Sequence, residues 1–146
     1  MGTYAHVGGQ AETDAVLAAI EDVVADMNII ARGIARDRLA KSNPVPKTVS
    51  IGLDGETLTV AFDERAYAAP LDGSNVQVVG LTGATLDYRV VVGKDQLQQH
   101  FIGKKGTRVN SMQWPGNERV KVKVKVSSDS LPKPLEYSLT LERRGS

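Results

Sequence analysis

Cysteine is absent from the 146 residues of this chain. Disulfide bonds, thiolate metal sites and cysteine nucleophiles are therefore excluded. Aromatic residues are scarce, at 5% of the chain, so extended stacking on nucleic-acid bases is not favoured. The net charge is also small, because 18 lysines and arginines balance 17 aspartates and glutamates. No overall field attracts nucleic acid or an anionic membrane, and any electrostatic partner must be bound by a local patch.

Long apolar runs are missing as well. No segment nears the roughly 20 residues of a membrane span, and residues 1–10 lack the apolar core of a secretory signal. We therefore expect no membrane contact and a location in the cytoplasm or in a particle assembled there. The length of 146 residues fits one domain, so we predict a single domain over 1–146.

The chain offers few groups for catalysis. His6 and His100 do not have the spacing of zinc ligands. No Gly-x-Ser-x-Gly elbow is present, and the segment 103–106 (GKKG) lacks the spacing of a phosphate loop. Asp54 and Asp72 each precede a glycine, which indicates turns rather than acid–base chemistry. We predict no enzymatic activity, no cofactor and no metal.

The first 41 residues predict an arm and a helix. Residues 1–12 are small and polar, which is typical of a flexible arm that only a neighbour orders. From Thr13 apolar residues recur every three or four positions, the period of an amphipathic helix. Because Pro44 and Pro46 cannot continue a helix, we predict one long helix over 13–41. Its packing face is expected to contain Val16, Ile20, Val23, Met27, Ile30 and Ile34.

Beyond Pro46 the apolar period changes to two, the spacing of β-strands. Asp54-Gly55 lies between two such segments and predicts a hairpin. The predicted strands are 48–53, 56–62, 75–79, 85–92, 108–113, 119–126 and 135–142. We therefore expect an α+β fold, in which the long helix is followed by an antiparallel β-sandwich or small barrel over 47–143.

The segment 119–126 alternates basic residues with valines, so in a strand the cations lie on one face and the valines on the other. One interpretation is that the cations bind a polyanion. The favoured alternative is that they keep the strand soluble and prevent edge-to-edge pairing. The candidate contacts for a polyanion or a second subunit are Arg119, Lys121, Lys123 and Lys125, with Lys104, Lys105 and Arg108.

The order of elements in the first half resembles a family of virion proteins. A helix ending in the basic stretch 34–41 is followed by the proline-containing break 44–48, a hairpin, and the segment 65–74 (RAYAAPLDGS). This order is similar to that of the tail-completion and head-to-tail joining proteins of long-tailed bacteriophages. The second half, 75–146, resembles the β-sandwich modules of capsid decoration proteins.

The resemblance implies a structural protein of the virion, assembled in the host cytoplasm. It would act by forming a homo-oligomeric ring or lattice and by contacting other virion proteins through the helix stripe and the arm. The first alternative is a capsid decoration protein. The second is a polyanion- or nucleic-acid-binding module that uses the strand 119–125.

Overall fold

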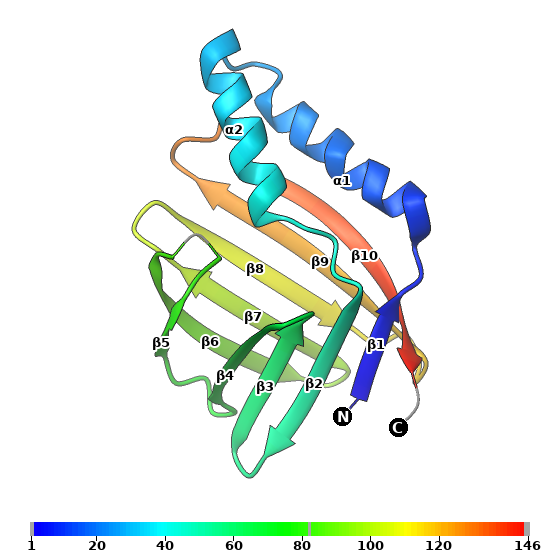
Figure 1. The fold of residues 1–146 in the computed structure, drawn as a ribbon. Helices are drawn as coiled ribbons and strands as arrows, with labels where there is room; N and C mark the ends of the chain where they lie inside the picture. Colours follow the sequence, from blue (N-terminus) through cyan, green and yellow to red (C-terminus); the bar gives the residue numbers. More distant parts are fainter. Residues whose placement is uncertain (1, 82, 145–146) are drawn as a thin grey trace.

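The structure is a computed structural model that describes residues 2–81 and 83–144. In this part of the chain, two helices lie between the first and second of ten strands (Figure 1). The chain begins with β1 (Gly2–His6), α1 (Gly9–Val24) and α2 (Ile29–Ser42). They are followed by β2 (Thr48–Asp54), β3 (Thr57–Phe62), β4 (Arg65–Pro70), β5 (Val76–Val79), β6 (Thr85–Gly93), β7 (Gln96–Ile102), β8 (Gly106–Gln113), β9 (Arg119–Ser128) and β10 (Leu135–Arg144).

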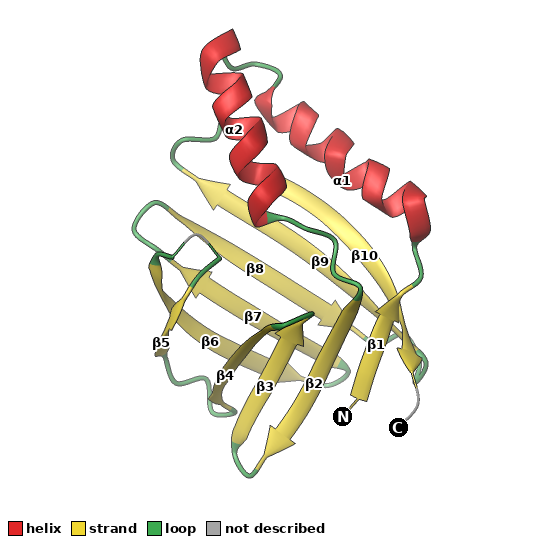
Figure 2. Ribbon diagram, in the orientation of Figure 1, coloured by secondary structure: helices red, strands yellow, loops and turns green. Residues whose placement is uncertain are grey.

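All the strands belong to one antiparallel sheet with the order β4-β3-β2-β1-β10-β9-β8-β7-β6-β5. The sheet curls until β4 contacts β6, and the two helices cover one end of the resulting barrel (Figure 2). Aromatic rings close the seam between β4 and β6: the Tyr67 ring centroid lies 5.6 Å from that of Tyr88 and 5.1 Å from that of Phe101. The expected α+β fold with a small barrel is confirmed, whereas the sandwich alternative is wrong because a single sheet curls on itself.

The alternation of β9 determines which side chains enter the barrel. Its valines at 120, 122 and 124 are buried, and the basic residues between them are exposed. The predicted separation of the two faces is thus confirmed. However, β9 pairs with both β8 and β10. Protection of a sheet edge is therefore the wrong explanation for its lysines.

The predicted single helix over 13–41 is two helices. The chain leaves the first helix after Val24, and Asn28 adopts an extended conformation with φ −66° and ψ 162°. The Asn28 side chain caps the second helix by accepting a hydrogen bond of 2.9 Å from the Ala31 amide. The apolar period runs through this break, so periodicity alone did not reveal it.

The break also divides the predicted packing face. Val16, Ile20 and Val23 are buried in α1, and Met27 is partly buried against the core. In contrast, Ile30 is 78% exposed and Ile34 is 51% exposed on α2. The packing face therefore ends at the turn between the helices.

The flexible arm predicted over 1–12 is also wrong for the residues described. Gly2–His6 form β1, which pairs with β2 on one side and β10 on the other, and Tyr4 is buried in the core. The helix already begins at Gly9. The prediction for Met1 lies outside the described residues. Ladder hydrogen bonds to both neighbours order a segment whose own apolar pattern is too short to reveal a strand.

Two further strands, β4 and β7, were not predicted. The β4 sequence is rich in alanine (RAYAAP), which has a weak strand propensity. The β7 sequence (QLQQHFI) places Gln99 on the inner face, between Leu97 and Phe101. Since a polar residue breaks the alternation there, the period of two is obscured. The hairpin around Asp54-Gly55 is confirmed, with Asp54 opposite Thr57.

Helix α1 docks along β10 beyond the point where β1 ends. The last β1–β10 pair joins His6 to Leu141. At the next position the Thr140 amide and hydroxyl each donate a hydrogen bond of 2.7 Å to the Glu12 carboxylate, which also lies 2.9 Å from His6 Nε2. Burial acts to raise the pKa of Glu12, but these hydrogen bonds outweigh it and lower the pKa. In the described part of the chain, neither helix is long and apolar enough to cross a membrane.

The division of the packing face predicts unequal costs for two isoleucine truncations. Ile20→Ala removes a core side chain that is 2% exposed and should lower the free energy of unfolding by about 2–5 kcal/mol. Ile34→Ala, at an exposed helix position, should change it by less than about 1 kcal/mol. Urea unfolding followed by circular dichroism measures both. Equal losses would show that α2 packs against the barrel through Ile34.

The Glu12 contact predicts an acid-sensitive contribution to stability. Because the folded pKa is lowered, the contribution is complete above the unfolded pKa of about 4.3 and disappears as the pH falls through the folded pKa. Glu12→Gln should lower the free energy of unfolding by about 1–3 kcal/mol near neutral pH, with a smaller difference below about pH 4. Chemical unfolding at several pH values measures this. Glu21→Gln, in an exposed pair with Arg36, is the matched control. If the difference in unfolding free energy between the wild type and Glu12→Gln stayed constant with pH, the stabilising role of the Glu12 carboxylate would be contradicted.

Candidate functional site

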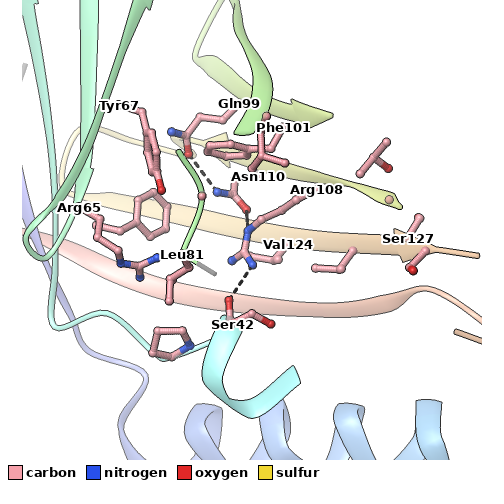
Figure 3. Close-up of a pocket in the computed structure, with 18 of the residues that line it drawn as sticks. Ser42, Arg65, Tyr67, Leu81, Gln99, Phe101, Arg108, Asn110, Val124 and Ser127 are labelled. Carbon is pink, nitrogen blue, oxygen red and sulfur yellow. Dashed lines mark hydrogen bonds between the residues drawn. The ribbon is translucent and has the colours of Figure 1, made fainter. Parts of the chain in front are cut away.

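A cavity of about 260 Å³ lies inside the barrel, between the end of α2 and the strands (Figure 3). Its walls combine apolar and basic side chains. The apolar part of the lining includes Phe62, Tyr67, Leu86, Phe101, Val124, Val126 and Leu139. The basic part consists of Arg65, Lys105 and Arg108. No aspartate or glutamate is found among the described residues that line it.

A chain of hydrogen bonds runs through the interior from β6 to β8. Gln99 Nε2 donates to the Tyr88 hydroxyl at 2.9 Å. Asn110 Nδ2 donates to Gln99 Oε1 at 3.0 Å, and Arg108 Nε donates to Asn110 Oδ1 at 3.2 Å. Gln99 and Asn110 are both buried. Each buried amide therefore has partners that compensate for its loss of water.

The same chain continues to the segment after α2. Arg108 NH1 donates to Asn43 Oδ1 at 2.8 Å and to the Ser42 carbonyl at 3.1 Å. Tyr137 on β10 also donates its hydroxyl proton to Asn43 Oδ1, at 2.9 Å, and Arg108 NH2 lies 3.4 Å from the Tyr137 oxygen. Arg108 thus connects the barrel wall to the end of the helical cap.

The charge of Arg108 has no counterion in this network. A guanidinium stays protonated inside a protein, and the four acceptors around Arg108 are neutral amide, carbonyl and hydroxyl oxygens. Over the described ranges, no carboxylate forms an ion pair with Arg108, Arg65 or Lys105. The cavity is consequently an electropositive space with apolar walls.

The two tyrosines of the network are held in their neutral form. Burial raises the pKa of Tyr88 to about 12, against the opposing effect of the hydrogen bond from Gln99. Burial also raises the pKa of Tyr137, although Arg108 acts in the opposite direction. Tyr137 therefore presents a hydroxyl donor beside the guanidinium.

The sequence-predicted basic residues do not form one patch. Arg119, Lys121, Lys123 and Lys125 are exposed on the outer face of β9, where Arg119 lies 3.6 Å from Glu142. Lys104 and Lys105 belong to the turn between β7 and β8, and Lys105 reaches the cavity lining. Arg108 lies on the inner face, so it is separated from the β9 cations by the barrel wall. Whether the outer cations contact an anion stays a prediction.

Sequence reasoning missed four polar residues of the site. They are Asn43, Gln99, Asn110 and Tyr137. One signal was present: Arg108 and Asn110 share their strand face with Met112, so two polar side chains occupy inward positions. Gln99 could be recognised as an inward-facing residue only if 96–102 were predicted as a strand.

No protein-family model matches the chain, and no curated protein matches its sequence. The fold, however, is similar to that of solved lipid-binding proteins. Lipid binding protein 8 of Caenorhabditis elegans has a TM-score of 0.62 and 14% identity, with 99% of this chain and 94% of that chain covered. Fatty-acid-binding protein 1 of Echinococcus granulosus has a TM-score of 0.60 and 13% identity, over 99% and 97% of the two chains. A Schistosoma mansoni fatty acid binding protein in complex with arachidonic acid has a TM-score of 0.55 and 19% identity, over 100% and 96%.

These similarities correct the functional hypothesis from the sequence. The resemblance to tail-completion and head-to-tail joining proteins is wrong, because the whole chain superposes on fatty-acid and lipid-binding folds. The virion location, the ring or lattice of subunits, and the capsid-decoration and polyanion-binding alternatives for the function are overturned by the same similarity. The narrower prediction that the outer cations of β9 contact an anion or a second subunit stays untested. The expectation that the chain is not an enzyme agrees with neighbours named as transporters and binding proteins.

The raised pKa of Tyr88 predicts late ionisation. Its phenolate absorbance near 295 nm should appear only at about pH 12. Because the folded pKa is raised, the corresponding stability is complete below the unfolded pKa of about 10 and disappears as the pH rises through the folded pKa. A difference titration of the wild type against Tyr88→Phe isolates this signal. Ionisation of Tyr88 near pH 10 in the folded protein would contradict its burial.

Proposed function

We propose that this protein binds a small amphipathic anion of the fatty-acid class inside its barrel and carries it in solution. The observation that carries the proposal is the cavity itself, since apolar walls enclose the guanidinium of Arg108 without an acidic partner among the described lining residues. The fold similarity to fatty-acid and lipid-binding proteins supports the same ligand class.

The geometry suggests how such a ligand binds. A carboxylate accepts charge-assisted hydrogen bonds from a guanidinium, and these are roughly twice as strong as neutral ones. Arg108 would supply this interaction and the Tyr137 hydroxyl a further donor, because the two groups lie 3.4 Å apart. Arg65 and Lys105 add positive potential to the same cavity.

The apolar lining provides for the tail. The lining includes the rings of Phe62, Tyr67 and Phe101 and the aliphatic side chains of Val124 and Leu139. Removing hydrocarbon from water contributes about 0.8 kcal/mol for each buried CH₂ group. The tail would therefore supply most of the affinity, and the head-group contacts would select the anion.

Binding of matched ligands tests the proposal. Decanoate should bind the wild-type protein, and Arg108→Gln should weaken its binding by about 10- to 100-fold, since bonds to charged groups contribute about 1.5–3 kcal/mol. Decanol, which has the same chain length without the charge, should be affected much less. Isothermal titration calorimetry measures both ligands.

Lys121→Gln is the control, because it removes one positive charge from the exposed outer face of β9. It should leave decanoate binding unchanged. The proposal would be refuted by wild-type protein that binds no fatty acid, or by equal losses in the Arg108 and Lys121 variants.

A further inference from the structure

Asn43 accepts hydrogen bonds from the same donors that we propose for an anionic head group. It follows α2 directly, and its side chain is buried. Its single amide oxygen accepts hydrogen bonds from Arg108 NH1 at 2.8 Å and from the Tyr137 hydroxyl at 2.9 Å. One nitrogen of Arg108 and the Tyr137 hydroxyl are therefore directed at a neutral oxygen of the chain itself.

We propose that Asn43 is an internal competitor that the head group of the ligand must displace, and that it thereby makes the site selective for anions. This inference rests on the proposed function. A carboxylate placed at the same donors cannot share their directions with the Asn43 amide, because both acceptors would need the same space within hydrogen-bonding distance. One of them must leave.

Charge decides which acceptor stays. A carboxylate and Arg108 are both charged, whereas the Asn43 amide oxygen accepts from the guanidinium as a neutral group. An alcohol offers no such advantage over the amide oxygen. Displacement is thus favourable for an acid and not for an uncharged ligand with the same tail.

The displaced segment also separates two hollow spaces. Pro44 and Pro46 line both the barrel cavity of about 260 Å³ and a second hollow of about 510 Å³ beside α1. The second hollow is also lined by His6, Val16, Ile20, Asn43 and Lys47. A shift of 43–46 would move the wall between the two hollows and provide space for a longer ligand tail.

The far end of this segment is fixed. The Lys47 and Thr48 amides donate to Asp63 Oδ1 at 2.9 and 3.0 Å, and the His6 amide donates to the Lys47 carbonyl at 2.9 Å. At the near end, Asn43 is bonded to Arg108, to Tyr137 and to the Leu39 carbonyl. Movement on ligand binding is therefore expected between 43 and 47.

Substitutions of Asn43 distinguish whether it competes with the ligand for Arg108 or holds Arg108 in place for the ligand. Asn43→Ala removes the competitor and should increase the affinity for decanoate by roughly fivefold to tenfold, more than for decanol. Asn43→Asp places a carboxylate of the chain beside Arg108 and should weaken decanoate binding by at least about tenfold, with little effect on decanol. Asn117→Ala is the matched control, since it removes the same side chain from an exposed position that lines neither the barrel cavity nor the second hollow; it should leave both affinities unchanged.

A decrease in decanoate affinity with Asn43→Ala would overturn the inference, because it would show that Asn43 holds Arg108 in place for the ligand. Hydrogen exchange on the wild-type protein gives a second readout that requires no variant. Amides in 39–47 should exchange faster with decanoate bound, and slower or unchanged exchange would overturn the inference. Wild-type protein that fails to bind decanoate refutes the proposed function itself, so the two failures are distinguishable.

Discussion

The guanidinium of Arg108, placed inside a barrel with neutral partners only, is the interaction on which the site depends. It joins the buried amides of β7 and β8 to the helical cap through Asn110 on one side and Asn43 on the other. A partly buried cation needs compensation. Here the described residues supply oriented dipoles rather than a negative charge, which leaves the full charge available to a ligand.

The fold places this charge by simple alternation. Arg108, Asn110 and Met112 share the inner face of β8 because successive side chains point to opposite faces of a strand. The valines of β9 and the apolar residues of β10 do the same on the neighbouring strands. An electropositive position and a hydrocarbon-like wall therefore follow from one geometric rule applied to adjacent strands.

Much of this architecture was accessible from the sequence. Alternation identified β9 and β10 because their inner faces are uniformly apolar, and Asp54-Gly55 identified the hairpin between β2 and β3. Alternation failed at β7, where buried Gln99 takes an inward position that only its partners Tyr88 and Asn110 make tolerable. The helix period failed at Asn28, because a capping residue can end and restart a helix without disturbing the spacing of apolar residues.

The site was less accessible because its members come from distant parts of the chain. Arg108 was grouped with the β9 lysines on the basis of charge, although the direction of its side chain sets it apart from them. Asn43 lies just before the proline-containing break 44–48, and only the curl of the sheet brings it to Tyr137. The phage resemblance relied on the order of elements, which does not specify which residues face an interior.

The aromatic seam between β4 and β6 has a mechanical consequence. Elsewhere the barrel wall is a continuous ladder, and widening it would require several backbone hydrogen bonds to break together. At the seam, Tyr67 meets Tyr88 and Phe101 through ring contacts, which tolerate sliding and tilting at small cost. In the described wall, the seam is therefore a line where the girth of the barrel can change without breaking a ladder of backbone hydrogen bonds.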